Sequence, residues 1–514
     1  MIHHSYRSPA TPATRHLALT RGPAILLAMS LGLCSIPSGT GGTEIPVATV
    51  RLAAADTPSP AGADLIADGR DDGQQLQAAF DRLGELGGVV YLMPGHYRLD
   101  SAGQTVNVPS HTTLDGGGAA VLECLVTGQQ GALRFSDVEN VTIRGLHFTS
   151  TGDEHAAMFA MMNVGSGRSR DITVQHCRFT GFTNYALRMN MPGTRFRFIH
   201  NRLSDMGRVG KGGSAINGAR MIDSLIGWNT VNRCGVDAGD WGIYISGGGA
   251  RNLQVVGNTL RQCAAGIKDL GDGSDRKIVI SQNLIEGTRR GRSIALGGCR
   301  DVLVSDNIIT LGTGGAAIGT ETSVQQVLIS RNVIDMNGAG RQGGAGIEIA
   351  ADDSSFVSIV GNQVFGGHPT STCIRVTTVQ HGVISDNLLR VRRGMLADAA
   401  FGGCGIQIGR PATPHAWHLL VSGNRIHSPV GRNVGIQLTA GPGPVAKSHV
   451  QLIGNTLQGF QFAITLDRMR GGRYRDVVIR GNTSTSAPLV GKQSEIDERI
   501  VIEGNTEPSA RGPD

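Results

Sequence analysis

One short pattern of apolar and polar residues recurs along most of this chain: apolar-x-apolar-x-x-Asn. Leu253-Gln-Val-Val-Gly-Asn258 and Val302-Leu-Val-Ser-Asp-Asn307 are two of its copies. Alternating apolar residues predict a short strand with one buried face, and the polar residue that closes each copy predicts a turn. Eleven intervals separate the first and last Asn and span 304 residues, about 28 residues each. The pattern ends in Asn201, Asn229, Asn258, Asn283, Asn307, Asn332, Asn362, Asn387, Asn424, Asn455, Asn482 and Asn505.

Most copies contain a second predicted strand ahead of the first, introduced by a small residue, as in Gly242-Ile-Tyr-Ile and Gly346-Ile-Glu-Ile. A third, weaker strand follows the Asn, as in Asn307-Ile-Ile. Two or three strands in a unit of about 25 residues suit a coil that buries Val and Ile and stacks on its neighbours. The pattern therefore predicts an all-β solenoid of parallel strands.

The recurring Asn has a structural explanation. Asn at a turn can take the left-handed conformation, and its side-chain amide can bond to the Asn one coil away. We therefore expect a ladder of Asn side chains that belongs to the scaffold, and we exclude these residues from the candidate site.

A capping helix is predicted at the N-terminal end of the solenoid. Apolar residues at helical spacing follow Asp71 and Asp72, either of which can serve as the N-cap, and Gly87 is a C-terminal stop signal. We expect this helix to cover the open end of the first coil. The apolar residues are Leu76, Ala79, Phe80, Leu83 and Leu86.

The same region carries a family resemblance. The segments Asp68-Gly-Arg-Asp-Asp72, Gly87-Gly-Val-Val-Tyr-Leu-Met-Pro-Gly-His-Tyr97 and Val108-Pro-Ser-His-Thr-Thr-Leu-Asp-Gly-Gly-Gly118 resemble the start of pectate-lyase-superfamily proteins. That group includes phage tailspikes, pectin and alginate lyases, mannuronan C5-epimerases and polygalacturonases. The resemblance implies a single-stranded right-handed parallel β-helix with an N-terminal capping helix. It does not specify an activity, because these motifs are cap and core elements, and the catalytic motifs of the epimerases (Asp-Pro-His) and polygalacturonases are missing.

The N-terminal segment predicts export. An apolar stretch of about a dozen residues between Pro23 and Pro37 follows a positively charged stretch, which is typical of a secretory signal peptide and too short to span a bilayer. Lipid anchoring at Cys34 is less favoured, because Leu33 stands where a small residue is required. We expect a secreted or periplasmic protein without a membrane span. The predicted organisation is a signal peptide (1–38), a linker (39–63), the β-helix domain (64–506) and a polar tail (507–514).

Charge and cysteine content exclude several classes. The formal net charge is +6, and three Arg in the signal segment reduce it to +3 for the exported chain, without the basic stripe of a nucleic-acid-binding protein. Eight Cys in 514 residues do not form a dense disulfide framework. Cys234 and Cys263 each fall five residues after a ladder Asn, and a disulfide and two packed thiols are both compatible with that spacing. No Cys or His spacing indicates a zinc site.

The resemblance places a groove along the sheet built from the Gly-Ile-x-Ile strands. If Ile243 and Ile245 point inward, strand alternation turns Tyr244 outward, and the same frame predicts one outward residue for each coil. Neighbouring coils are about 4.8 Å apart, so these residues form a column. The predicted column contains Arg188, Asn190, Tyr244, Lys268, Ala295, Glu321, Glu348, Arg375, Gln407, Gln437 and Thr465.

The charged middle of the column suggests chemistry on a uronate. Elimination or epimerisation at C5 needs a group that neutralises the carboxylate, a base for the C5 proton and an acid. Arg188 can neutralise, Lys268 or Tyr244 can act as base, and Tyr244 can act as acid. The insertion before Tyr244 adds Asp237, Asp240 and Trp241, the last as a face for sugar stacking; Asn190, Glu321, Glu348 and Arg375 complete the expected substrate contacts. An exposed strand decorated with Tyr and Lys is the structural alternative.

Glu321 and Glu348 form a rival constellation. The prediction places them on successive coils, about 5 Å apart, near the carboxyl spacing of a retaining glycosidase. Arg375 on the next coil can instead neutralise Glu348 in an ordinary ion pair.

Three function classes follow. The first is an exported enzyme that acts on an acidic polysaccharide by lyase or C5-epimerase chemistry, either degrading the polymer or working within an exopolysaccharide secretion machinery. The second is a glycoside hydrolase, and the third is a non-catalytic polysaccharide-binding or cell-surface structural protein. No metal ligands are specified; five aspartates near Lys268 permit a calcium ion without defining its site. They are Asp237, Asp240, Asp269, Asp272 and Asp275.

Overall fold

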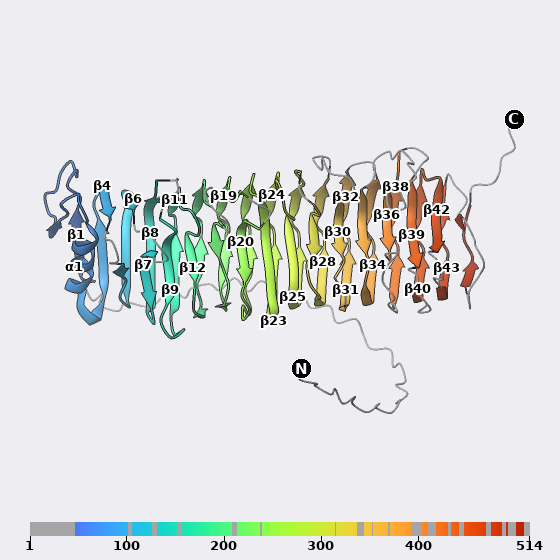
Figure 1. Cartoon of the computed structure of the whole chain (residues 1–514), viewed down its shortest axis with the longest axis horizontal. Coiled ribbons are helices and arrows are strands. Elements are labelled where there is room, and N and C mark those ends of the chain that lie inside the picture. Colours follow the sequence, from blue (N-terminus) through green and yellow to red (C-terminus); the bar gives the residue numbers. More distant parts are fainter. Residues whose placement is uncertain are drawn as a thin grey trace, which may run out of the picture. The chain divides into compact units, whose positions relative to one another are not determined.

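The folded unit begins at Val47. The computed structural model describes residues 47–100, 105–125, 131–151, 157–207, 213–236, 239–313, 315–336, 344–351, 353–367, 371–391, 403–409, 418–429, 433–440, 447–468, 474–485, 490–491 and 500–507. The predicted signal peptide with Cys34 and all but the first residue of the predicted tail lie outside this part. The strands of the unit stack in coils along one axis, from β1 to β46 (Figure 1).

Successive coils of the chain build three parallel sheets. Each regular coil contributes one strand to the first sheet, one to the second sheet just before the ladder Asn, and one to the third sheet just after it, as the pattern predicts. The first sheet consists of β5 (Val106–Asn107), β7 (Gly131–Ser136), β9 (Phe159–Val164), β12 (Leu187–Met189), β16 (Ile216–Asn217), β20 (Trp241–Ser246), β23 (Ala265–Ser281), β25 (Ile294–Ser305), β27 (Ile318–Thr320), β30 (Ala345–Ile349), β33 (Thr372–Val376), β36 (Cys404–Ile408), β39 (Val434–Ala440), β42 (Phe462–Arg468) and β45 (Val490–Gly491).

The long strands β23 and β25 continue from the first sheet into the second. The other strands of the second sheet are β1 (Thr49–Ala53), β3 (Gly88–Leu92), β6 (Thr112–Cys124), β8 (Glu139–Thr149), β10 (Arg170–Gln175), β14 (Arg197–Ile199), β18 (Leu225–Gly227), β21 (Gln254–Val256), β28 (Gln325–Ser330), β31 (Ser354–Val360), β34 (Val379–Ser385), β37 (Leu419–Ser422), β40 (Lys447–Ile453), β43 (Tyr474–Arg480) and β46 (Ile500–Glu503). β1 lies in the segment predicted to be a linker, and it pairs with β3, so the folded part begins before residue 64.

The third sheet begins with β4 and continues through the second halves of β6 and β8. Its strands are β4 (Gly95–Leu99), β11 (Arg178–Thr180), β15 (Arg202–Ser204), β19 (Thr230–Asn232), β22 (Thr259–Arg261), β24 (Leu284–Glu286), β26 (Ile308–Thr310), β29 (Val333–Asp335), β32 (Gln363–Gly366), β35 (Leu388–Val391), β38 (Arg425–His427), β41 (Thr456–Gln458) and β44 (Thr483–Ser484). The short strands β2 (Leu65–Ile66), β13 (Gly193–Thr194) and β17 (Met221–Ile222) complete the structure.

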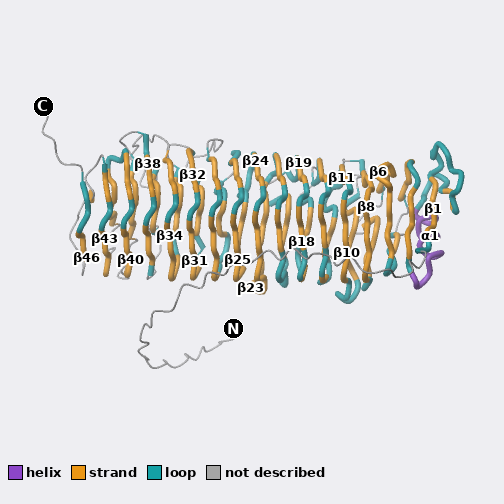
Figure 2. Tube along the Cα trace, turned by 180° about the vertical axis from the view of Figure 1, so that it is seen from behind, coloured by secondary structure: helices purple, strands orange, loops and turns teal. Residues whose placement is uncertain are grey.

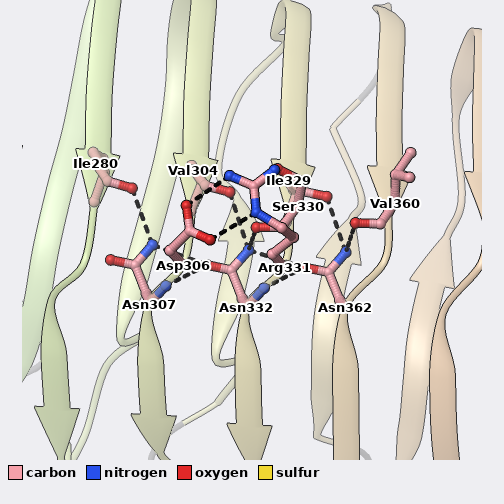
Figure 3. A network of polar contacts seen from close by, with 10 residues as sticks. All are labelled: Ile280, Val304, Asp306, Asn307, Ile329, Ser330, Arg331, Asn332, Val360 and Asn362. Carbon is pink, nitrogen blue, oxygen red and sulfur yellow. Dashed lines mark hydrogen bonds and ion pairs between the residues drawn. The ribbon is translucent and has the colours of Figure 1, made fainter. Parts of the chain in front are cut away.

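The predicted Asn ladder is confirmed, with one correction. In its middle, Asn307 Nδ2 donates to Asn332 Oδ1 over 2.9 Å, and Asn332 Nδ2 donates to Asn362 Oδ1 over 2.9 Å (Figure 3). The left-handed residue is not the Asn but the residue before it, such as Asp306 (φ 57°) and Arg331 (φ 54°). This places the Asn side chain inside the coil, where burial strengthens its hydrogen bonds. The exposed turn residues pair with each other: Arg331 and Asp306 form a bidentate ion pair (Figure 3).

The N-terminal cap is the helix α1 (Gly73–Leu83), which begins after Asp72 and lies beside β1 at one end of the stack (Figure 2). Leu76, Phe80 and Leu83 on one face are buried, as predicted. The predicted end is wrong: the helix stops at Gly84 (φ 61°) and a 3-10 turn follows, which leaves Leu86 95% exposed. In the part of the chain that the structure describes, no helix is long and apolar enough to cross a bilayer.

Candidate functional site

The outer face of the first sheet presents one residue for each coil in strict register. Tyr244 lies beside Lys268, and Glu348 lies beside Arg375, as the alternation predicts. The prediction fails at Glu321, because Gly319 of β27 pairs with Glu348 at the column position and Glu321 follows two residues later, beyond the strand. The column runs through Arg134, Met162, Arg188, Asn217, Tyr244, Lys268, Ala295, Gly319, Glu348, Arg375, Gln407, Gln437 and Thr465.

Aromatic rings surround the N-terminal part of the column. The guanidinium of Arg188 lies 4.6 Å above the centre of the Phe159 ring, which also stacks on Tyr185 at 5.9 Å. Burial raises the pKa of the Tyr185 phenol, and the neighbouring Tyr244 adds to this shift. Asn190, predicted to face outward beside Arg188, is partly buried and directs its amide to Met162 Sδ at 3.1 Å. Sequence reasoning missed Tyr185, because it lies before the strand and outside the Ile-x-Ile frame.

Tyr244 and Lys268 lie side by side near the middle of the described chain. Tyr244 is partly buried and packs against a small cluster of Trp241, Ala265 and Ala295. Lys268 Nζ lies 5.2 Å from the centre of the Trp241 ring and 6.0 Å from that of Tyr244. A cation at these distances is attracted by both rings. Tyr244 and Lys268, two of the three residues that the sequence predicts to be catalytic, are therefore neighbours on adjacent strands.

Two of the predicted substrate contacts are buried. Trp241 is 1% exposed, so its ring supports Lys268 from below and has no free face for a sugar, which corrects its predicted role. Asp240 is 0% exposed, and its Oδ2 accepts a hydrogen bond from the Val236 backbone N–H at 2.7 Å. It holds the loop before β20 and offers no exposed carboxylate to a substrate. Asp237 lies outside the described residues.

A continuous ladder of charged and amide side chains extends from Lys268 toward the C-terminus. Lys268 Nζ contacts Glu321 Oε2 at 2.9 Å, and the Arg292 guanidinium contacts Glu321 at 3.4 Å and Glu348 at 3.3 Å. Arg375 contacts the other oxygen of Glu348 at 3.1 Å. The side chains of these five residues are 14–26% exposed. From Arg375 the ladder continues through amides to a carboxylate, by way of Gln407 (2.8 Å), Gln437 (3.4 Å) and Asp467 (2.6 Å).

This arrangement disfavours the glycosidase interpretation. A retaining glycosidase needs one carboxyl group that carries a proton and one that does not. Glu321 lies between Lys268 and Arg292, and Glu348 lies between Arg292 and Arg375. Each carboxylate is thus engaged by two cationic side chains, and neither can act on a glycosidic bond without first leaving its ion pairs. The ion pair between Glu348 and Arg375 is the structural alternative that the sequence left open.

Behind Lys268, two aspartates are buried in the coil. Asp269 is 0% exposed and Asp275 is 1% exposed. Asp275 Oδ1 accepts the Ala250 backbone N–H at 2.7 Å, whereas no N–H or hydroxyl group of the described residues donates to Asp269. Burial, and then the charge of Asp275, raise the pKa of the Asp269 carboxyl well above its usual range. Neither aspartate reaches the outer face, so neither can contribute to a calcium site there.

Comparison with known proteins identifies the fold. A tailspike protein variant of E. coli bacteriophage HK620, in complex with a pentasaccharide, matches with a TM-score of 0.55 at 16% identity, over 80% of this chain and 74% of the tailspike. A deletion variant of that tailspike gives 0.54 at 15% identity, over 79% and 76%. The fold is a right-handed parallel β-helix. It is the fold that the sequence predicts, and identities this low show the fold alone.

Two further comparisons show less about this chain. The mannuronan C-5 epimerase AlgE6 A-module of Azotobacter vinelandii matches at 16% identity over 85% of this chain and 94% of the module, but its TM-score of 0.34 carries no argument. The family description "periplasmic copper-binding protein (NosD)" matches residues 227–395 of this β-helix, about a third of the chain. No curated protein matches the sequence.

The described side chains in the matched segment do not fit a copper site. His381, the histidine described there, stacks between Phe356 and His418, with ring centres 5.1 and 4.8 Å apart. Throughout the described residues, no group of three His, Cys, Asp or Glu side chains can hold a metal ion. The thiols in this segment are free and at most 3% exposed: Cys234, Cys263, Cys299 and Cys373.

Proposed function

We propose that this protein is an exported carbohydrate-active enzyme that binds an acidic polysaccharide along the outer face of the first sheet. Contact between Tyr244 and Lys268 at the centre of the column is the observation that carries the proposal. The ammonium of Lys268 is partly buried beside two aromatic rings, and the phenol of Tyr244 lies one coil away. A polymer that follows the column meets both groups within one sugar residue.

Lys268 is suited to neutralise the carboxylate of the reacting uronate. Its ion pair with Glu321 at 2.9 Å involves a protonated amine, and a protonated amine attracts an anion but does not accept a proton. Neutralising the carboxylate lowers the barrier to removing the C5 proton, because negative charge develops on that group in the transition state. We assign Lys268 this role in place of the base that the sequence also allowed.

Proton transfer then belongs to Tyr244. In an elimination, a base takes the C5 proton, the bond between C4 and the glycosidic oxygen breaks, and that oxygen takes a proton; in an epimerisation, a proton returns to the opposite face of C5. Tyr244 lies beside Lys268 and is the base in this proposal. Tyr185 is an electrostatic neighbour of Tyr244, and burial raises its pKa, which favours the neutral phenol; we assign it as the proton donor.

Arg188 serves a neighbouring sugar. It lies two coils before Tyr244, about 10 Å away, which is too far for the carboxylate that contacts Lys268. Its position on the column suits a second uronate of the same polymer. Glu348, Arg375 and the amides beyond them extend the face for further sugar residues.

Location outside the cytoplasm is part of the proposal. It rests on the apolar N-terminal segment of the sequence and on the word periplasmic in the matching family description. A protein that acts on an extracellular polymer, or on a polymer during export, can work on either side of an outer membrane.

A panel of polysaccharides tests the proposal. The purified protein is mixed with polymannuronate, polygalacturonate, a glucuronate-containing polymer and a neutral glucan, and binding and products are measured. We expect binding to at least one polyuronate, with the ultraviolet absorbance of a C4=C5 double bond or a changed C5 configuration in the NMR spectrum. New reducing ends without that absorbance would identify a hydrolase, and binding without product would identify a non-catalytic protein. Either result would contradict the proposed chemistry.

A further inference from the structure

The ammonium of Lys268 already has a carboxylate partner. Glu321 Oε2 lies 2.9 Å from Lys268 Nζ, and the two side chains are 26% and 14% exposed. Within the described residues, Glu321 is the acidic partner of Lys268. A carboxylate supplied by the protein itself therefore lies at the group that is placed to bind the carboxylate of a sugar.

Glu321 reaches this place from outside the column. The column position on its coil is Gly319, which has no side chain, and Glu321 follows in the bend after β27. Its side chain therefore lies above the sheet, as a bound ligand would, instead of projecting from the sheet itself.

Arg292 fills the space that Gly319 leaves. A Cβ atom at residue 319 would lie 2.5 Å from Arg292 Nε and 2.9 Å from its Cδ, so any larger residue would force the Arg292 side chain to move. From this position the guanidinium contacts both Glu321 and Glu348. Glu321 thus has two cationic partners, and losing Lys268 leaves it still paired with Arg292.

We propose that Glu321 is an internal mimic of a uronate carboxylate. It occupies the carboxylate subsite of Lys268 in the free protein, and an acidic polysaccharide must displace it. Arg292 holds the displaced carboxylate. This inference rests on the proposed function, and it names the residue that sets the affinity of the same site.

The proposal explains a selectivity for charged polymers. A neutral sugar offers no group that can replace Glu321 at Lys268, so the ion pair stays closed. A uronate replaces the Glu321 carboxylate at Lys268 with its own carboxylate. Its net binding free energy is reduced by the cost of breaking the ion pair between Lys268 and Glu321. Partly exposed ion pairs of this kind are weak enough to be exchanged by a ligand.

The test is the affinity of Glu321→Gln for a polyuronate, measured by isothermal titration calorimetry at low and at physiological salt. We expect the dissociation constant to fall about fivefold, the effect of removing one competing ion pair of moderate strength. Binding of a neutral glucan stays unchanged. Circular dichroism and the thermal midpoint verify that the variant is folded.

Two matched variants separate a local effect from one of net charge. Glu286→Gln makes the same charge change at an ion pair with Arg261 on the third sheet, away from the column. Glu348→Gln removes the same charge at a position on the column that does not contact Lys268. We expect the affinity to rise clearly more in Glu321→Gln than in either control, and we expect Lys268→Met to abolish the gain in the double variant.

The outcomes distinguish the inference from the function on which it rests. If the wild-type protein binds a polyuronate and Glu321→Gln binds it equally or more weakly, the mimic is wrong and the proposed function stands. Equal gains in all three variants would also overturn it. If neither the wild-type protein nor Glu321→Gln binds any polyuronate, both proposals fall. Binding that appears only in Glu321→Gln would support both.

Discussion

Removal of one Asn from the middle of the ladder is expected to be costly. Asn332 is 0% exposed, and its Nδ2 donates to Asn362 Oδ1 at 2.9 Å and to the Val304 carbonyl at 3.0 Å. Its Oδ1 accepts both the side-chain and the backbone N–H of Asn307, at 2.9 and 3.1 Å. Asn332→Ala removes these four hydrogen bonds and a fifth, from Nδ2 to the Ser330 carbonyl at 3.2 Å, and leaves buried donors on Asn307 without a partner. At about 1 kcal/mol for each bond, the free energy of unfolding falls by about 5 kcal/mol.

The last Asn of the ladder provides the control. Asn505 accepts hydrogen bonds from Asn482, donates to the Ile479 carbonyl at 2.9 Å and has no ladder partner beyond it among the described residues. It is also partly exposed, so water can replace the lost bonds. We expect Asn505→Ala to cost about 1 kcal/mol.

Hydrogen exchange is the suitable assay, because solenoid coils can open locally and a single global unfolding midpoint can hide this. Exchange of the Asn307 amide and of the neighbouring strands is measured by mass spectrometry in both variants, together with the urea midpoint. Faster exchange confined to the coils around residue 332 is expected. A cost below about 1 kcal/mol for Asn332→Ala, or a cost equal to that of Asn505→Ala, would refute the ladder as a main source of stability.

Three further changes test the buried groups and the column. The raised pKa of Asp269 means that the folded protein keeps this proton above pH ~4, where the unfolded chain releases it, so the stability of the fold falls as pH rises. Asp269→Asn should therefore raise the thermal midpoint at pH 7–8 but not at pH 4. An unchanged pH profile of the midpoint would contradict this. Gly319→Ala should displace the Arg292 side chain and lower the thermal midpoint, whereas Gly315→Ala, whose Cβ meets no atom, should not. Equal effects of the two substitutions would refute the passage of Arg292 over Gly319. Cys234 and Cys263 should resist alkylation until the protein unfolds; a disulfide in the native protein would contradict the free thiols.

The alternation of apolar residues and the recurring Asn were sufficient to predict the β-helix scaffold. Alternation fixed the inward faces of strands such as β30 and β33, and the Asn repeat fixed the spacing of the coils. The turn itself was less predictable: the left-handed residue precedes the Asn, and it is Gly257 in one coil but Trp228 or Gln282 in its neighbours. Many residue types tolerate this position because the buried Asn, not the turn residue, holds the coils together.

The site was predicted in part, and one error had a signal in the sequence. Asp269 has the same parity as Ile267 on β23, so alternation already turns it inward. The other errors had none. Glu321 lies just beyond the end of β27, where alternation no longer applies.

Arg292 shows the limit of a period-based argument. It starts before β25 and crosses the column at Gly319, a contact decided by side-chain length and by the absence of a neighbouring Cβ. Such a contact depends on the packing of two coils together. It becomes visible only when the coils are placed side by side.

The most direct test of the central claim is the reaction of Tyr244→Phe with the polyuronate that the wild-type protein converts. Loss of the phenol removes the proposed proton carrier and leaves Lys268 in place. The account predicts that the unsaturated or epimerised product disappears while the dissociation constant changes by less than about threefold. Product formation at the wild-type rate by Tyr244→Phe would contradict the assignment.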